Sequence, residues 1–250
     1  MSSPETVWHA RFVRQAGWTR PIRESCFRRF VFIPGDWILE AGCGTGAVTA
    51  ELSGLSGARA VGLDLDLRRL VAARAFDPSG VYLGGDAYRL PFPDGTFAMS
   101  VCHYLLLWLA EPVAVLREMA RVTRPGGRVA ALAEPDHAGR IDAPAPLDSL
   151  GRWQTFSLER QGADVRAGRM LAGWMSAAGL EDTEGGLLGA EWAQPRESDW
   201  EAEWQQVQED LTGMVPVDRL DAFRAAEVEA RARGGRVLFV PTFWASGKKP

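Results

Sequence analysis

A glycine-rich segment is the part of this 250-residue chain best suited to hold a ligand. It reads Glu40-Ala41-Gly42-Cys43-Gly44-Thr45-Gly46 and directly follows an apolar run that begins at Trp37. Glycines at such a turn let backbone amides approach a bound group, and the helix expected from about 47 to 55 adds its N-terminus. The spacing from Gly42 to Ala47 also satisfies the dinucleotide fingerprint, and a glycine turn sometimes only permits tight packing. The segment predicts a cofactor loop and leaves the cofactor open.

Two carboxylates follow the next two apolar runs. Asp64 ends the run Gly62-Leu63-Asp64, where a carboxylate at the end of a strand can accept hydrogen bonds from both hydroxyls of a ribose. The alternative role, an N-cap for the following helix, suits Asp66 at least as well. Asp86, in the loop 84–87, is placed to accept a hydrogen bond from an adenine amino group. The pattern favours a nucleoside-containing ligand.

Three histidines are available for proton transfer. His103 follows the expected fourth strand, where an open α/β sheet places ligands, so we expect it as the first candidate for a general base. His137 follows the fifth strand, and His9 lies in an N-terminal helix. A single histidine is more often a structural residue, and an acceptor that ionises easily needs no base.

The expected elements alternate between strands and helices up to residue 136. Strands are expected at 37–41, 60–65, 80–83, 97–104 and 128–133, and helices at 47–55, 66–76 and 111–122. The first thirty residues favour two helices, the second beginning at Pro21. Such alternation predicts a doubly wound, Rossmann-like α/β fold with a mostly parallel seven-stranded sheet, a helical N-terminal extension and C-terminal helical insertions.

The last hundred residues change in character and are rich in tryptophan. Helices are expected near 146–161, 164–178, 197–211 and 217–232, and strands at 186–192 and 236–245. We expect one domain overall, with a helical cap at 1–36, a cofactor-binding core at 37–136, and further strands with substrate-cap insertions at 137–250. A tryptophan-lined cap suggests an apolar or aromatic substrate, although Trp200 and Trp204 at i and i+4 would equally fix a helix to the domain.

Composition limits the function classes. A formal net charge of −4 and a pI near 5.5 disfavour nucleic acid as a partner. The spacing of the three cysteines matches neither a zinc site nor a redox pair, so we expect reduced thiols and no metal. The sequence shows no leader and no apolar stretch of about 20 residues, which favours a cytoplasmic protein without membrane contact. We expect a monomer or homodimer that acts on a small molecule.

Four ordered segments make the chain resemble a known family. ILEAGCGTG at 38–46, VGLDLD at 61–66, GDAYRLPFPDGTF at 85–97 and RVTRPGGRV at 121–129 resemble the class I S-adenosylmethionine-dependent methyltransferases, particularly the ubiquinone and menaquinone biosynthesis branch. The resemblance covers residues 38–136. One departure is Ala98, where the family usually has aspartate after Gly95-Thr96-Phe97.

The resemblance implies roles for individual residues. Toward the methionine portion of S-adenosylmethionine it implies Glu40, Gly42, Cys43, Gly44 and His103; toward the ribose and adenine it implies Asp64, Leu65, Gly85, Asp86 and Ala87. The implied reaction is in-line methyl transfer, with S-adenosylhomocysteine as the product. For the substrate we expect contacts from Trp18, Tyr104, His137, Trp200 and Trp204, and Phe12 is a further wall candidate, although aromatic residues at such spacing usually face the core. The alternatives are an NAD(P)-dependent oxidoreductase and a non-catalytic protein that binds S-adenosylmethionine.

Overall fold

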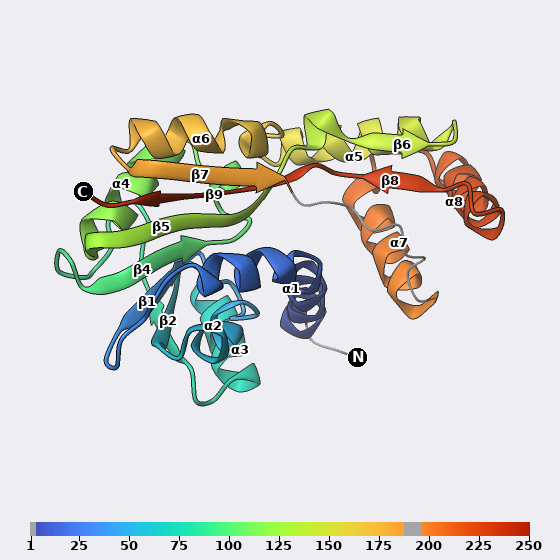
Figure 1. Ribbon diagram of the computed structural model, residues 1–250. Helices are drawn as coiled ribbons and strands as arrows, with labels where there is room; N and C mark the ends of the chain where they lie inside the picture. Colours follow the sequence, from blue (N-terminus) through green and yellow to red (C-terminus); the bar gives the residue numbers. More distant parts are fainter. Residues whose placement is uncertain (1–3, 188–196) are drawn as a thin grey trace. The chain divides into compact units, whose positions relative to one another are not determined.

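The computed structural model describes residues 4–187 and 197–250, in which strands and helices alternate along most of the chain (Figure 1). The strands are β1 (Trp37–Ala41), β2 (Arg59–Asp64), β3 (Val81–Gly84), β4 (Phe97–Cys102), β5 (Thr123–Pro135), β6 (Ile141–Ala143), β7 (Glu181–Leu187), β8 (Val237–Phe239) and β9 (Thr242–Lys248). The α-helices are α1 (Pro4–Arg28), α2 (Thr49–Ser56), α3 (Leu67–Phe76), α4 (Pro112–Val122), α5 (Leu147–Arg160), α6 (Ala167–Ala177), α7 (Glu197–Leu211) and α8 (Val217–Ala232).

Seven strands form one sheet in the order β3-β2-β1-β4-β5-β9-β7. β1 runs parallel to both β2 and β4, β2 runs parallel to β3, and β4 runs parallel to β5. β7 and β9 pair antiparallel at the other end. This topology confirms the predicted mostly parallel, doubly wound seven-stranded sheet. Parallel neighbours require crossover connections, and the helices in these connections lie on the faces of the sheet.

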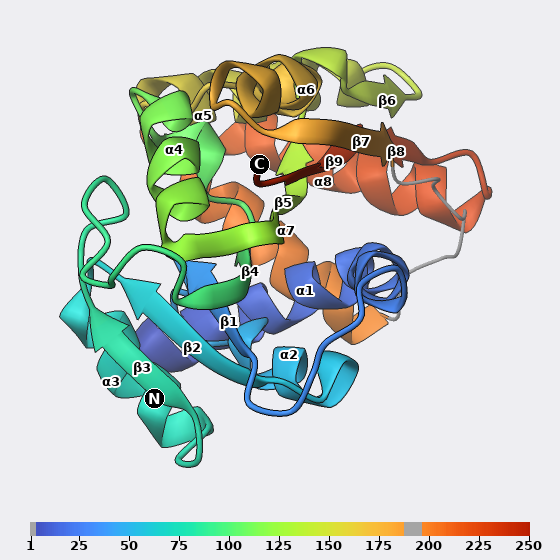
Figure 2. The same cartoon turned by 60° about the vertical axis from the view of Figure 1, so that its left-hand side comes forward.

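Alternating side chains of the strands supply a core on each face of the sheet. Leu39 and Ala41 pack with α4 and α6, whereas Ile38, which precedes Leu39 and faces the other side of the sheet, packs with α1 and α2. This period of two is expected for strands buried on both faces. Figures 1 and 2 show α4 and α6 on one side of the strands and α1, α2 and α3 on the other.

The chain divides into two compact units. The sheet unit comprises residues 1–134, 167–188 and 242–250, and the helical unit comprises 135–166 and 189–241. The helical unit holds α5, α7, α8 and a two-stranded ladder of β6 and β8, around its own core. The boundaries of this division differ from the predicted segments 1–36, 37–136 and 137–250, and the predicted substrate cap stays a prediction.

Three expected elements differ from the structure. Pro21 lies inside the single helix α1 rather than at the start of a second one, because burial of Ala16, Ile22 and Phe27 against the sheet outweighs the lost hydrogen bond. The strand expected at 186–192 is β7 at Glu181–Leu187, and residues 188–192 lie outside the described part. The strand expected at 236–245 is two strands in different ladders, and Pro241, which has no N–H to donate, lies between them.

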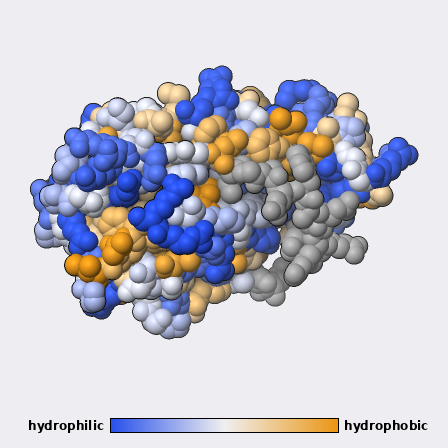
Figure 3. Space-filling model, viewed as in Figure 1, coloured by the Kyte–Doolittle hydropathy of each residue, from blue (hydrophilic) through white to orange (hydrophobic). Residues whose placement is uncertain are grey.

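The surface mixes residue types, as the face in Figure 3 shows. Apolar side chains such as Val31 and Leu65 are largely exposed in the sheet unit. Within the described residues, no helix combines the length and the hydropathy that a bilayer crossing requires.

Candidate functional site

The residues predicted to bind a cofactor meet at one edge of the sheet. Ala41 pairs with Leu63 of β2 and with Cys102 of β4, and Asp64 pairs with Gly84 of β3. Since these four strands are parallel, the loops that follow them leave from the same edge. Ten predicted cofactor residues therefore lie at this carboxyl edge, namely Glu40, Gly42, Cys43, Gly44, Asp64, Leu65, Gly85, Asp86, Ala87 and His103.

The glycine loop has a backbone that ordinary residues avoid. Gly42 has a φ of +72° and Gly44 a φ of +55°. The amides of Gly42 and Cys43 both donate to the carbonyl of Leu63, at 2.7 and 3.0 Å, which holds the loop against β2. A Cβ atom at Gly44 would lie 3.0 Å from the ring of Phe12. Glycine is required here both for the left-handed conformation and for the close approach of α1.

Asp64 holds the glycine loop after β1 and the turn after β2. Its carboxylate accepts hydrogen bonds from the amide of Gly44 at 2.7 Å and from the amide of Asp66 at 2.9 Å. Asp66, as predicted, caps α3 by accepting from the amide of Arg68 at 3.0 Å, and hydrogen bonds from Arg68 lower the pKa of Asp66 to about 2. The helix cap is thus supplied without Asp64, whose contact with a ribose stays a prediction.

Glu40 is a buried acid that forms no ion pair within the described residues, although the charge of Arg23 acts to lower its pKa. Its carboxyl group accepts a short hydrogen bond from the hydroxyl of Thr49, in the first turn of α2. Burial raises the pKa of Glu40 to about 8, against the opposing effect of this bond. The group is therefore largely protonated at neutral pH and would ionise if a ligand brought a positive charge beside it.

The loop after β3 is open to solvent. Asp86 is exposed, and one carboxylate oxygen accepts from the amide of Tyr88 at 2.9 Å. Gly85 donates to the carbonyl of Asp64 at 3.1 Å, and Leu65 is 74% exposed. An exposed apolar side chain beside an exposed carboxylate suits the flat, partly polar edge of a base.

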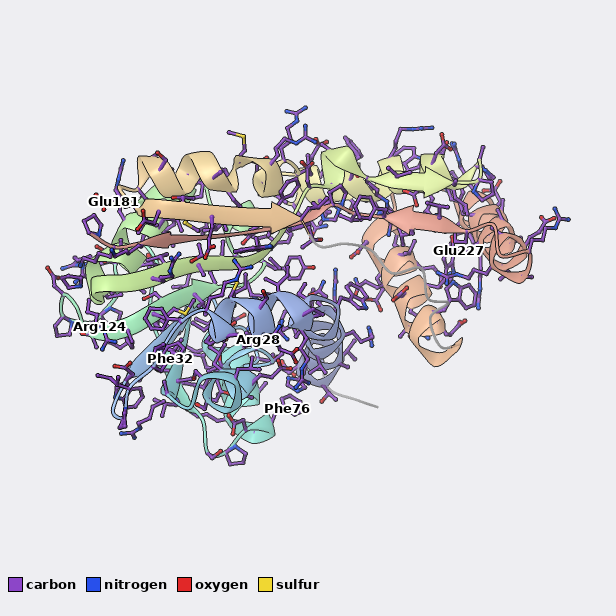
Figure 4. The ribbon with its side chains drawn as sticks, in the orientation of Figure 1. Arg28, Phe32, Phe76, Arg124, Glu181 and Glu227 are labelled. Atoms are coloured by element: carbon purple, nitrogen blue, oxygen red, sulfur yellow. The ribbon has the colours of Figure 1, made fainter. Side chains whose placement is uncertain are left out.

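Helix α1 covers the glycine loop. Nδ1 of His9 lies 2.9 Å from the hydroxyl of Thr45, and the His9 ring stacks on Phe76 at a centroid distance of 3.6 Å. Figure 4 marks Phe76 at the end of α3. The guanidinium of Arg69 lies 5.8 Å from the Phe12 ring. The sequence suggested His9 only as a general base, because nothing in its neighbourhood along the chain indicates contact with residue 45.

The segment after β4 is held by Glu134, at the end of β5. Its carboxylate accepts hydrogen bonds from the amides of Leu105, Leu106 and Leu107, at 3.0, 2.9 and 3.2 Å. Burial raises the pKa of Glu134 to about 7, although the three amides favour its charged form. The role of Glu134 was not predicted, since its only signal in the sequence is its position at the end of an apolar run.

The predicted substrate residues are divided between the units. Trp18, on α1, is 57% exposed, and Tyr104 has a φ of +51° and bonds through its side chain to Thr242. In the helical unit, Trp204 is only 2% exposed within the core and Trp200 packs against that core. Nδ1 of His137 is buried and has no hydrogen-bond partner in the part of the chain that the structure describes. Their contact with a substrate stays a prediction.

A surface pocket of about 430 Å³ lies within the helical unit. It combines two aromatic rings with two guanidinium groups and is lined by Ser149, Arg152, Trp153, Phe156 and Arg219. Arg152 is already bonded to Asp148 at 2.8 Å. No predicted site residue lines this pocket.

Sequence relatives carry methyltransferase names. The family described as "Methyltransferase domain" matches residues 39–131. The demethylmenaquinone methyltransferase of Mycolicibacterium vanbaalenii is 43% identical over 112 residues, which is 45% of this chain and 46% of that protein. Its counterpart from Mycolicibacterium paratuberculosis is 34% identical over 164 residues, 64% of this chain and 69% of that protein. The chain thus spans less than half of the first relative and about two thirds of the second.

Solved structures share the fold. The Haloferax volcanii protein solved in complex with a methyltransferase activator superposes with a TM-score of 0.60 at 19% identity, over 100% of this chain and 99% of that one. Phosphoethanolamine N-methyltransferase 2 of Haemonchus contortus, solved with S-adenosylmethionine, gives 0.57 at 13% identity, over 91% of this chain and 52% of that one.

Proposed function

Since the chain belongs to the class I S-adenosylmethionine-dependent methyltransferases of the menaquinone and ubiquinone branch, we propose that it transfers a methyl group to a small, apolar, quinone-like molecule. The observation that carries this proposal is the edge where a glycine loop with left-handed residues adjoins the buried acids Glu40 and Asp64. Relatives named for demethylmenaquinone support the acceptor class.

The donor set at this edge fits the cofactor. Burial raises the pKa of Glu40, and a nearby ammonium group would favour its ionised form. Glu40 therefore suits the ammonium group of the methionine tail. Asp64 has four lone-pair directions and spends two on amides, which leaves capacity for ribose hydroxyls. Asp86 and Leu65 would border the adenine. Gly42, Cys43 and Gly44 would approach the methionine portion through their backbone, with His103 beside it.

The protein's own part in such a reaction is mainly to position the reactants. When bound, the sulfonium supplies an electrophilic methyl group. The glycine loop and the two acids fix the donor end, and α1 covers that loop and keeps water away from it. Trp18, Tyr104, His137, Trp200 and Trp204 remain the proposed acceptor contacts. A quinol ionises readily, so that methyl transfer to its carbon or its hydroxyl oxygen needs no strong base on the protein to remove a proton.

Calorimetry followed by turnover tests the proposal. S-Adenosylmethionine and S-adenosylhomocysteine should bind the protein, and NADH should not. Release of S-adenosylhomocysteine should then appear with demethylmenaquinone or a related quinol and not with hydrophilic acceptors. Binding of NADH alone would instead favour an oxidoreductase, and cofactor binding without turnover on any quinol would favour a non-catalytic binding protein.

We further propose that the protein works in the cytoplasm, as a monomer or homodimer, with a small molecule as its substrate. The net charge of −4 and the described helices, none of which suits a bilayer, support this setting. Cell fractionation and light scattering on the purified protein test it. Recovery in the membrane pellet, or a larger assembly, would contradict it.

A further inference from the structure

Arg23 of α1 is completely buried at 0% exposure. Its Nη2 donates to Glu51 of α2 at 2.7 Å and to the carbonyl of Ala16 at 2.7 Å, and its Nη1 donates to the hydroxyl of Thr19 at 2.8 Å. Its Nε has no partner among the described residues. A buried guanidinium with an unmade hydrogen bond is costly, so some benefit elsewhere is expected to retain it.

Thr19 connects Arg23 to the carboxyl edge of the sheet. The Thr19 hydroxyl lies 2.7 Å from Nε2 of His103, 84 residues away in the chain. His103 directly follows Cys102, which pairs with Ala41, so it lies beside the start of the glycine loop. Arg23, Thr19 and His103 therefore form one chain of hydrogen bonds from the buried charge to the proposed methyl-transfer edge.

Proton counting at Thr19 selects the state of His103. The hydroxyl oxygen accepts a hydrogen bond from Arg23, and its own single proton can be donated to one acceptor. Its candidate acceptors are Nε2 of His103 at 2.7 Å and the carbonyls of Gln15 and Ala16, each at 3.2 Å. The shorter distance is typical of a hydroxyl donor, and the guanidinium polarises the hydroxyl and makes it a better donor. Nε2 is then the bare nitrogen of the ring, and Nδ1 carries the proton.

We propose that Arg23 and Thr19 are positioning residues that hold His103 as the neutral tautomer protonated on Nδ1, so that His103 offers a hydrogen-bond donor at this edge instead of abstracting a proton. The sequence put His103 forward as a general base, and this geometry assigns it a different role. The tautomer stands on the hydrogen bonds alone, whereas its use toward the cofactor rests on the proposed function.

The charges around His103 favour its neutral form. Burial and then the charge of Arg23 lower the pKa of His103 to about 3. From α2, Glu51 faces Arg23 rather than the ring. From β5, Glu134 is directed to the amides of residues 105–107, and the neighbouring Tyr104 ring packs edge-on at 4.5 Å. No carboxylate in the described part of the chain makes an ion pair with His103 that would stabilise its protonated form.

Nitrogen NMR on histidine-labelled protein tests the tautomer. The chain has three histidines, so a His103→Gln spectrum assigns the signal. The wild-type protein should show one neutral form with the proton on Nδ1, unchanged from pH 5 to 8. A proton on Nε2, or titration of His103 near its ordinary range, would overturn the proposal in the unmutated protein, whatever the variants do.

Matched variants of Thr19 test the cause. Thr19→Val keeps the shape and removes the hydroxyl, and should give a mixture of tautomers, whereas Thr19→Ser should restore the single form. Thr19→Val should also weaken S-adenosylhomocysteine binding roughly fivefold, as expected for one misdirected hydrogen bond, with recovery in Thr19→Ser. A single Nδ1-protonated form in Thr19→Val would overturn the role of Thr19. Absence of cofactor binding in the wild-type protein would refute the proposed function and leave the tautomer result unaffected.

Discussion

Two sets of buried acids, one in each unit, have different hydrogen-bond partners. In the helical unit, Asp142 accepts from Arg140 and from Arg236 at 2.8 Å, and Glu227 accepts from Arg236 at 2.7 Å. In the sheet unit, the acids at the carboxyl edge accept from hydroxyl and amide groups, and no ion pair to Glu40, Asp64 or Glu134 occurs among the residues that the structure describes.

The difference separates two purposes of a buried carboxyl group. An acid paired with arginine has its charge compensated by the protein and gains little from a ligand. An acid that accepts only from neutral donors either stays charged without a cation or has a raised pKa. A cationic ligand would stabilise its charge, and a hydroxyl-bearing ligand would donate hydrogen bonds to it. The arrangement indicates a structural role for Asp142 and Glu227, and it supports the binding role proposed for Glu40 and Asp64.

The largest expected effect is the loss of a paired acid. Asp142→Asn removes the negative charge that pairs with the buried guanidinium groups of Arg140 and Arg236. It should lower the free energy of unfolding by about 3 to 5 kcal/mol. Urea unfolding followed by tryptophan fluorescence measures this. Asp148→Asn is the matched control, because its pair with Arg152 is exposed, and its midpoint should hardly move. Equal losses in both variants would end the structural interpretation of Asp142.

An unpaired acid should matter to the ligand instead. Asp64→Asn keeps an acceptor for the amide of Gly44 but removes the charge, and should weaken S-adenosylhomocysteine binding by about 1 to 3 kcal/mol. Asp66→Asn, two residues further on, should leave affinity unchanged because the Asp66 carboxylate is used to cap α3 and to pair with Arg68 and Arg69. Calorimetry gives both values. Unchanged affinity in a folded Asp64→Asn protein would remove Asp64 from the site.

The raised pKa of Glu40 has a consequence for stability against pH. The folded protein keeps a proton on Glu40 up to about pH 8, whereas the unfolded chain releases it near 4.5. Unfolding free energy should therefore fall as pH rises through this window. Glu40→Gln should reduce the loss between pH 5 and 7 by about 2 kcal/mol. Urea midpoints at several pH values measure the slope, and parallel curves for the two proteins would contradict the raised pKa.

The smallest effect concerns the conformation of the loop. Gly44→Ala places a Cβ at a φ of +55° against Phe12, and should cost about 1 kcal/mol of stability and reduce cofactor affinity. Gly54→Ala, inside α2 with open space at its Cβ, should stabilise by about 0.5 kcal/mol. Thermal unfolding compares them. A neutral Gly44→Ala would mean that charge alone defines this edge.

Local patterns predicted most of the fold and part of the site. The run from Trp37 to Ala41, the glycine loop and the cap at Asp66 are features of neighbouring residues, and the structure confirms them. The single helix through Pro21 was not predicted, because packing against the sheet outweighs a local signal. The division of 236–245 between two ladders likewise depends on pairing partners far away in the chain.

By itself, the sequence determined the class of fold, the glycine loop after the first strand and the strand-end positions of Glu40 and Asp64, because strand period, glycine spacing and strand-end acids are local properties. Only the tertiary structure decided which distant residues form hydrogen bonds around this edge of the sheet. Thr19 contacts His103, which is 84 residues away in the chain. Glu134 accepts hydrogen bonds from residues 105–107, which are about 28 residues away. Hydrogen bonds over such separations follow from packing, which no spacing in the sequence encodes.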